Sequence, residues 1–353
     1  SQGIQGRQGT TGQHGSQGIQ GRQGTTGTQG IQGITGSSNT FLYSRIVWVD
    51  PNGSDATGVF GRIDKPFLTI PAAYNAGVSS GAGEFTIMVL PGDYTVSGLT
   101  ITSQNVTIKL VGRVKITNTT SSNMFIIESN SNFSMVADIK ETFSSNSTGA
   151  ELISTGTGYH FYVGDSKVHL KNLSIKSTST FSYGGYQISI ENPSKLTIHG
   201  CDIIGNGGQS YNIRMTDAAI SSTRLSIRDS YLKQSGQGIT NIYASPFGSA
   251  GSHSIKGEIQ NTTFQVAAEA AIHIHTMAPT NAGTHLTFSN NIFYAADENA
   301  WMWQDEGPGK VNIDVIADVI GNAGTLNGGF VNTTPTSVID GLNSIQDPSV
   351  WHI

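Results

Sequence analysis

The sequence predicts an all-β protein in which a right-handed parallel β-helix follows a collagen-like triple-helical stalk, assembled as a homotrimer. Two observations predict this fold. Every third residue from Gly3 to Gly36 is glycine, and five later eight-residue segments align without gaps at intervals of 28, 29, 32 and 29 residues. A strict Gly-X-Y run is typical of a triple helix, and a repeat of this length is typical of a solenoid.

The predicted stalk covers residues 1–38. Its first block, SQGIQGRQGTTG, returns unchanged at residues 16–27. In a collagen triple helix three polyproline-II-like chains wind together, and only glycine fits at the crowded axis. A Gly/Gln/Thr linker is the alternative, but a linker would not need glycine in strict register. The repeat therefore predicts three chains, because one chain cannot form this structure alone.

The stalk contains no proline. Proline pre-sets the polyproline-II φ angle and lowers the entropy lost on ordering. We therefore expect the stalk to be marginal alone and to need a trimerising domain after it. Without proline there is no hydroxyproline, which argues against an animal collagen. The chain also begins inside the repeat, so we expect a longer fibre with further fibre or virion proteins at its N-terminal end.

Composition excludes several classes of protein. Only 12 % of the 353 residues are charged, the net charge is −5, and Ser, Thr, Asn and Gly supply the polarity. This balance favours many turns over long helices and does not favour nucleic acid as a partner. The single cysteine, Cys201, excludes an intrachain disulfide. No apolar run approaches the length of a membrane span, so no membrane insertion is expected.

The five aligned segments predict the rungs of a coil. Their third and eighth columns are wholly apolar, so both columns should point inward. The segments are VHLKNLSI (168–175), LTIHGCDI (196–203), LSIRDSYL (225–232), GEIQNTTF (257–264) and LTFSNNIF (286–293).

The fifth column of the alignment predicts a bend. It contains residues that tolerate a left-handed backbone best, namely Asn172, Gly200, Asp229, Asn261 and Asn290. Two strands meeting at this bend, stacked turn upon turn, describe a parallel β-helix.

Weaker rungs and loops complete the predicted organisation. The segments 105–112, 132–139 and 310–320 show the same alternation, and the Gly/Ser-rich stretch 234–253 is expected to be an inserted loop. We therefore expect a linker and N-terminal cap at 39–84, the β-helix at 85–322 and a C-terminal cap or tail at 323–353.

The start of the predicted coil resembles a known family. The stretch WVDPNGSDATGVFGRIDKPFLTIPAAYNAG (48–77), followed by FTIMVLPGDYTV (85–96), resembles the opening segment of pectate-lyase-like right-handed β-helix proteins. The resemblance implies a helix that covers the open end of the coil, with Thr69 as N-cap and Pro71 in its first turn. Together with the proline-poor stalk, the chain resembles a trimeric viral or phage fibre protein. This fold carries both lyases and inert adhesins.

Asp202 and Asp229, with Arg228 beside them, are the candidates for catalysis. Glycoside hydrolysis needs two carboxylates, and lyase chemistry needs a basic residue near acidic calcium ligands. The two aspartates are expected near one corner of adjacent rungs, and because neighbouring strands lie about 4.8 Å apart, their carboxylates could approach one ligand. Asp229 also occupies the bend column, where a structural role explains it. The acidic pairs at 297–298 and 305–306 are expected on loops, as solvated charge.

Two histidines are the weak candidates for a metal site. The segment AIHIHT places His273 and His275 on one face of a strand. Three such pairs around a threefold axis would offer six imidazoles to a transition metal. The alternative is two outward polar residues between inward isoleucines. No cofactor is predicted.

Five aromatic residues are the candidates for glycan or receptor binding, because exposed aromatic rings stack on sugars and anchor interfaces. Their alternative role is burial in a subunit contact or under the tail. They are Trp301, Trp303, Tyr183, Tyr186 and Tyr211.

These features favour a trimeric fibre or tail-fibre adhesin that presents its β-helix to a host-surface polysaccharide or another receptor. The expected place is the virion surface, with an extracellular or cell-surface location as the alternative. A polysaccharide depolymerase on the same scaffold, acting as a lyase or glycosidase, is the second hypothesis. A purely structural virion spike is the third.

Overall fold

The structure is a computed structural model that divides into two units, Ser1–Thr40 and Phe41–Ile353. In the first unit it describes eight exposed residues, Gly3, Gly6, Gly9, Thr10, Gly12, His14, Gly15 and Gly18. In the second it describes 45–139, 149–178, 187–205, 211–216, 223–234, 241–245, 255–266, 270–275, 285–295, 301–306, 312–316, 319–322, 331–332 and 338–340.

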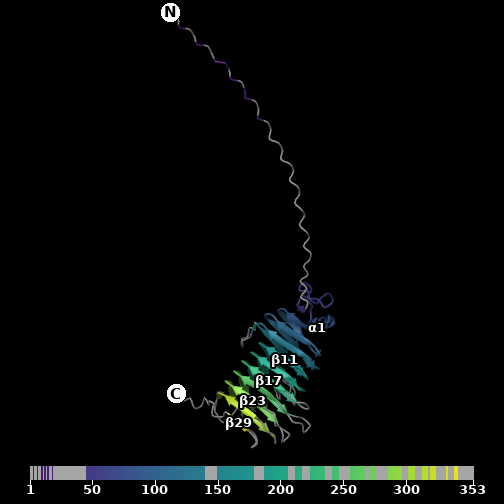
Figure 1. The fold of residues 1–353 in the computed structure, drawn as a ribbon, viewed down its shortest axis with the longest axis vertical. Helices are drawn as coiled ribbons and strands as arrows, with labels where there is room; N and C mark the ends of the chain where they lie inside the picture. The colour runs from purple at the N-terminus through teal and green to yellow at the C-terminus, as the bar shows by residue number, and fades with distance from the viewer. Residues whose placement is uncertain are drawn as a thin grey trace. The chain divides into compact units, whose positions relative to one another are not determined.

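The described part of the second unit is a coil of parallel strands that form three sheets (Figure 1). Sheet A contains β1 (Ile46–Val49), β2 (Glu84–Val89), β5 (Asn105–Leu110), β8 (Asn132–Ala137), β11 (Lys167–Lys171), β14 (Lys195–His199), β17 (Arg224–Arg228), β20 (Lys256–Gln260), β23 (His285–Ser289), β26 (Asn312–Ile316) and β29 (Val338–Asp340).

Sheets B and C take the remaining strands. Sheet B contains β3 (Gly92–Thr95), β6 (Val114–Asn118), β9 (Ala150–Ser154), β12 (Leu173–Ser177), β15 (Asp202–Gly205), β18 (Tyr231–Gln234), β21 (Thr263–Val266), β24 (Ile292–Ala295) and β27 (Val319–Asn322). Sheet C contains β4 (Leu99–Thr102), β7 (Phe125–Glu128), β10 (Phe161–Val163), β13 (Ile188–Ile190), β16 (Ile213–Thr216), β19 (Ile242–Ser245), β22 (Ala270–His275), β25 (Trp301–Glu306) and β28 (Val331–Asn332).

The strand register confirms the five-segment alignment. In sheet A, Leu170 pairs with Ile198, then Ile227, Ile259 and Phe288 on successive turns. The eighth column pairs in the same way in sheet B, from Ile175 through Phe293. In the described part of these columns every side chain is buried. The all-β fold with a parallel β-helix is therefore present, and its right-handed sense stays a prediction.

The sequence predicted a strand of sheet C at His273 and His275, which belong to β22, and missed the third strand in the other turns. Each turn carries three strands, because sheet C follows sheet B before the chain re-enters sheet A. The predicted loop at 234–253 is wrong in its middle, since it contains β19. The acidic pair at 305–306 is likewise not on a loop, because both residues belong to β25. Most strands of sheet C have only two to four residues, too few for an alternation to stand out in the sequence.

The bend between sheets A and B confirms the prediction from the fifth column. Asn172, Gly200, Asp229, Asn261 and Asn290 all have a positive φ, between 48° and 64°. Asparagine, aspartate and glycine occupy this left-handed region at lower cost than other residues. The same backbone turn is therefore repeated once per rung, and it fixes where sheet A ends.

The interior is a continuous apolar column. Phe161 pairs with Phe125 in sheet C, and their rings stack with centroids 5.4 Å apart and an interplanar angle of 14°. Phe133 of sheet A packs against both rings. Aromatic stacking adds to the burial of each ring, so these turns are held together by side chains as well as by strand pairing.

A single described helix, α1 (Ile70–Ser79), packs against the first strands of sheet A, as expected. Thr69 is its N-cap, and its Oγ1 accepts a hydrogen bond from Ala72 N at 3.3 Å. Asp55 accepts hydrogen bonds from the N–H groups of Leu68 and Thr69, which holds the cap in place. Within the described residues no helix has the length and apolarity of a membrane span.

Candidate functional site

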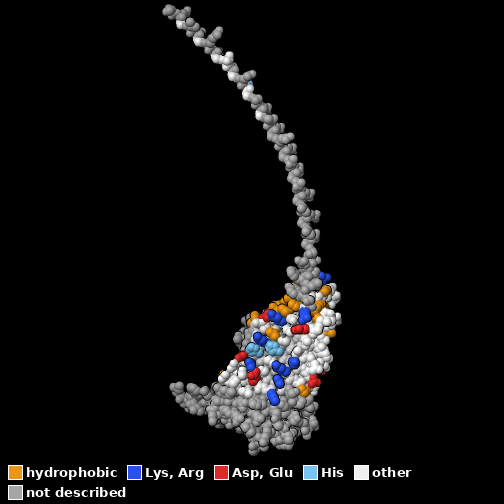
Figure 2. Space-filling model, in the orientation of Figure 1, with side chains coloured by type: hydrophobic (Ala, Val, Ile, Leu, Met, Phe, Trp, Pro, Cys, Tyr) orange, Lys and Arg blue, Asp and Glu red, His pale blue; other side chains and the backbone are white. Residues whose placement is uncertain are grey.

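Four basic side chains stand in one column on the outer face of sheet A. Lys167, Lys195, Arg224 and Lys256 pair with one another in direct register on β11, β14, β17 and β20, and all four are exposed. Neighbouring strands lie about 4.8 Å apart, so the charges repeat at that interval along the coil. We call these four residues the basic ladder. Figure 2 shows Lys, Arg and His side chains gathered over these strands.

The ladder differs from most other described cations of the coil, because none of its members has an acidic partner among the residues that the structure describes. Within the described residues, ion pairs join Arg45 to Glu84, Arg62 to Asp64, Arg113 to Asp93, Lys109 to Asp138, Lys176 to Glu151 and Arg228 to Glu258. No ion pair in that part of the chain involves a ladder residue. Four like charges therefore lie side by side without neutralisation.

A row of smaller polar side chains runs beside the ladder. His169, Thr197 and Ser226 occupy the next outward position on β11, β14 and β17. Ser134 Oγ lies 3.3 Å from His169 Nδ1. Burial lowers the pKa of His169, and the positive charges of Lys171, His199 and Lys195 lower it further. The lowered pKa of His169 therefore reflects both its burial and the positive charges around it.

The face is hollowed along the same strands. One shallow hollow of about 800 Å³ is lined by Lys195, Arg224 and Lys256 of the ladder together with Thr197 and Ser226. A second, of about 580 Å³, extends over β2 to β14 and includes Lys167 and Lys195. Ladder residues therefore line open surface that a ligand can reach.

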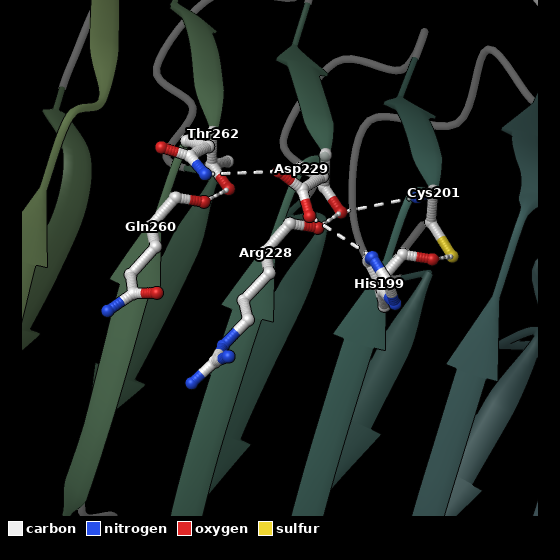
Figure 3. A network of polar contacts seen from close by, with 8 residues as sticks. His199, Cys201, Arg228, Asp229, Gln260 and Thr262 are labelled. Carbon is white, nitrogen blue, oxygen red and sulfur yellow. Dashed lines mark hydrogen bonds and ion pairs between the residues drawn. The ribbon is translucent and has the colours of Figure 1, made fainter.

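The predicted candidates Asp229 and Arg228 lie at the edge of this face, where sheet A bends into sheet B (Figure 3). Asp229 Oδ2 lies 3.1 Å from His199 Nε2, and Asn261 Nδ2 donates a hydrogen bond to Asp229 Oδ1 at 3.2 Å. Arg228 forms an ion pair with Glu258 on the next strand. Both candidates are thus engaged in contacts between turns.

Asp202 lies in a different environment from Asp229. It begins β15 in sheet B, pairs in register with Ser174 and Tyr231, and is only 8 % exposed. Burial raises the pKa of Tyr231, and the charge of Asp202 raises it further. The structure therefore places one aspartate inside a sheet and the other on an exposed bend.

The remaining candidates are placed in part. His273 and His275 belong to β22, and Trp301 and Trp303 to the neighbouring β25, with Trp303 opposite Ile272. The side chains of these four residues, and Tyr183 and Tyr186 entirely, lie outside what the structure describes. Tyr211 is half-buried, and its carbonyl accepts a hydrogen bond from Gln187 N at 3.2 Å. The described residues contain no group of three metal-ligating side chains.

The sequence reading missed the basic ladder although its signal was present. Each ladder residue directly precedes one of the aligned segments, and His285 does so at the fifth. Extending the alignment by one residue would have shown a wholly basic column. The alignment was based on the apolar columns, so the residue directly before each segment was left out of it.

Comparisons with known proteins find likeness in structure alone. No protein-family model matches the chain, and no curated protein matches it. The crystal structure of Escherichia coli YbhC is 13 % identical, with 80 % of this chain and 72 % of that chain covered and a TM-score of 0.44. The structure of a pectin methylesterase in complex with hexasaccharide VII is 12 % identical, with 84 % and 93 % covered and a TM-score of 0.35. The parallel β-helix assignment rests on the strand pairing of this chain itself.

Proposed function

We propose that this chain is a subunit of a homotrimeric fibre whose β-helix attaches the fibre to a host-surface polysaccharide or another receptor. The proposal includes a collagen-like stalk, a place on the virion surface, and further fibre or virion proteins at the N-terminal end. One observation carries it: an unbroken Gly-X-Y run immediately precedes a long parallel β-helix.

Contacts within one chain do not explain the glycine register. A Cβ added at Gly3, Gly6, Gly9, Gly12, Gly15 or Gly18 meets no atom of the chain within 4 Å. A larger residue would therefore fit at each described position if the chain acted alone. Packing of three chains around a common axis supplies the missing reason for glycine.

Three chains also suit attachment. A coil of stacked turns presents the same polar positions at regular intervals on an exposed sheet face. Three such faces in one assembly convert weak single-site binding into much stronger total binding, provided that all three can engage together. A low-charge, repetitive surface with hydroxyl and amide groups is suited to carbohydrate.

The mass of the full chain in solution tests the assembly. We expect light scattering to give three times the 37.3 kDa chain mass. A single-chain mass in dilute native solution would overturn the proposal.

A substitution in the stalk tests the triple helix itself. Gly18→Val should lower or abolish an early thermal transition in circular dichroism and leave the later transition of the β-helix in place, because a side chain does not fit at the axis. Thr10→Val, at an X position of the repeat, is the matched control and should keep the early transition. Identical melting of both variants and the parent would contradict a triple helix.

A polysaccharide depolymerase, either a lyase or a glycosidase, is the second candidate. The observation that favours it is one exposed edge on which Asp229 contacts His199 and the adjacent Arg228 pairs with Glu258. Incubation with host capsule or lipopolysaccharide should then release new reducing ends or unsaturated uronates, and Asp229→Asn should stop the release. Absence of turnover favours the adhesin.

A purely structural spike is the third candidate, and cell binding separates it from the other two. The labelled full chain should be retained on host cells if it is an adhesin. A spike that binds nothing would wash off as readily as an unrelated protein of the same size.

A further inference from the structure

We propose that the basic ladder is a binding track for a linear acidic polysaccharide that carries one carboxylate per sugar. The polymer lies across the strands, parallel to the axis of the coil, with successive carboxylates at Lys167, Lys195, Arg224 and Lys256. This inference deepens the proposed function and rests on it, because it names the glycan class and the face that takes it.

The spacing of the ladder fits such a polymer. Ladder residues stand in direct register on consecutive strands, so a cation occurs about every 4.8 Å. That interval is comparable with the length of one sugar in an extended polysaccharide. A polyuronate can therefore meet one cation with each carboxylate without bending away from the sheet.

The electrostatics indicate that the ladder is kept for a ligand. Like charges directly opposite each other on neighbouring strands destabilise a sheet. Elsewhere on sheet A, exposed cations have acidic partners, as Lys109 has in Asp138 and Arg228 has in Glu258. Asp165 lines a hollow together with Lys167, Lys195 and Arg224, yet it forms no ion pair within the described residues. A bound polyanion would supply the neutralisation that the chain does not.

The row beside the ladder supplies the polar contacts that sugars need. Thr197 and Ser226 lie two residues after Lys195 and Arg224, so each hydroxyl is on the same face as its cation. Both hydroxyls and three of the cations line the hollow of about 800 Å³, as do Asp229 and Glu258, and Glu258 accepts a hydrogen bond from Ser226 Oγ at 3.3 Å. A sugar ring seated there can place its carboxylate on the ladder and its hydroxyl groups on this row.

The same face argues against nucleic acid as the occupant. Proteins that bind single strands stack the bases on aromatic side chains. The outward positions of β11, β14, β17 and β20 are all described, and they contain no Phe, Tyr or Trp. The net charge of −5 also gives no general attraction to a polyanion. The local column of charge is therefore the element that selects the ligand.

Binding of the full chain to polygalacturonate tests the inference, with neutral dextran as the uncharged comparison. The double variant Lys195→Gln/Arg224→Gln removes two central cations. The matched control is Lys115→Gln/Lys233→Gln, which removes two lysines from β6 and β18 of sheet B. Both variants change the net charge equally, and circular dichroism should show that both remain folded.

We expect the ladder variant to bind polygalacturonate about tenfold more weakly and the control variant to bind within about twofold of the parent. Binding by the parent should weaken with added salt, and dextran should not compete. Equal losses in the two variants would show that net charge alone matters, which would overturn the inference. Equal affinity for a single-stranded oligodeoxynucleotide, lost equally in the ladder variant, would overturn the glycan assignment.

Cell retention separates failure of this inference from failure of the proposed function. If the full chain is retained on host cells but does not bind polygalacturonate, the ladder inference fails and the adhesin stands. If the chain neither binds polygalacturonate nor is retained on cells, both fail. Retention that the ladder variant loses and the control variant keeps supports both.

Discussion

Asp229 Oδ2 lies 3.1 Å from His199 Nε2, a contact that spans one full turn of the coil. Asp229 is also the residue whose backbone makes the bend on its own turn, with φ at 51°. The side chain therefore contacts the turns before and after its own, through His199 and Asn261, while its backbone shapes the bend of its own turn. The two contributions can be separated by substitution.

Replacing Asp229 separates them. Asp229→Asn keeps a residue that tolerates the left-handed backbone, and the weakened contact with His199 is half-exposed, so the free energy of unfolding should fall by only about 0.2–1 kcal/mol. Asp229→Ala also forces alanine into the left-handed region and should cost about 1–2 kcal/mol more. Urea unfolding measures both. Equal losses would mean that the backbone of the bend contributes little.

Ile227→Ala tests the inward column. Ile227 is fully buried, so the cavity left by the substitution should lower the free energy of unfolding by about 2–5 kcal/mol per chain. Ser226→Ala changes the neighbouring outward residue and should stay within about 0.5 kcal/mol of the parent. Thermal unfolding of the two variants at the same temperature would contradict the assignment of inner and outer faces.

Gly77→Ala tests the contact between α1 and the coil. A Cβ at Gly77 would lie 2.2 Å from Cε2 of Phe85, whose ring is buried. The overpacking should destabilise the protein by about 1–3 kcal/mol although alanine favours helix. Gly83→Ala is the control, because a Cβ there meets no atom within 4 Å. If Gly77→Ala were as stable as the control, α1 would not be packed on Phe85.

His160 makes stability depend on pH. Burial lowers the pKa of His160 to about 4 from 6.5, so the unfolded chain binds more protons than the folded chain between these values. The free energy of unfolding should therefore fall as the pH drops from 6.5 to 4, by roughly 3 kcal/mol. His160→Met should flatten that slope, because methionine does not bind a proton. Methionine should fit at this position, since Met124 holds the equivalent place one turn earlier. An unchanged slope in urea titrations would show that other groups cause it.

Much of the fold could be predicted from residues that must face inward or adopt a left-handed backbone. The column from Leu170 to Ile259 allowed a single register, because a slip of one residue would turn every side chain to the opposite face. The bend column allowed few residue types. Both columns are therefore visible without a structure, and the strand pairing reproduces both.

Most of sheet C and the basic ladder were missed for different reasons. Strands such as β16 and β19 hold few residues with mixed polarity, and their place is decided by pairing with neighbouring turns. Lys195 and Arg224 are each unremarkable on the sequence, since an isolated exposed cation is common. The two cations form part of a ladder only because they stand opposite each other on neighbouring strands, and that arrangement is visible only in the fold.

Because the strand register is unbroken, the length of the coil can change in steps of one complete turn. Excising or duplicating one complete turn, such as residues 195–223, keeps every other strand opposite an equivalent neighbour. Each such event within the ladder changes the length of the coil by about 4.8 Å and deletes or adds one ladder cation. The length of the β-helix and the number of ladder cations therefore change together. A longer β-helix with more ladder cations should bind a charged polymer more tightly.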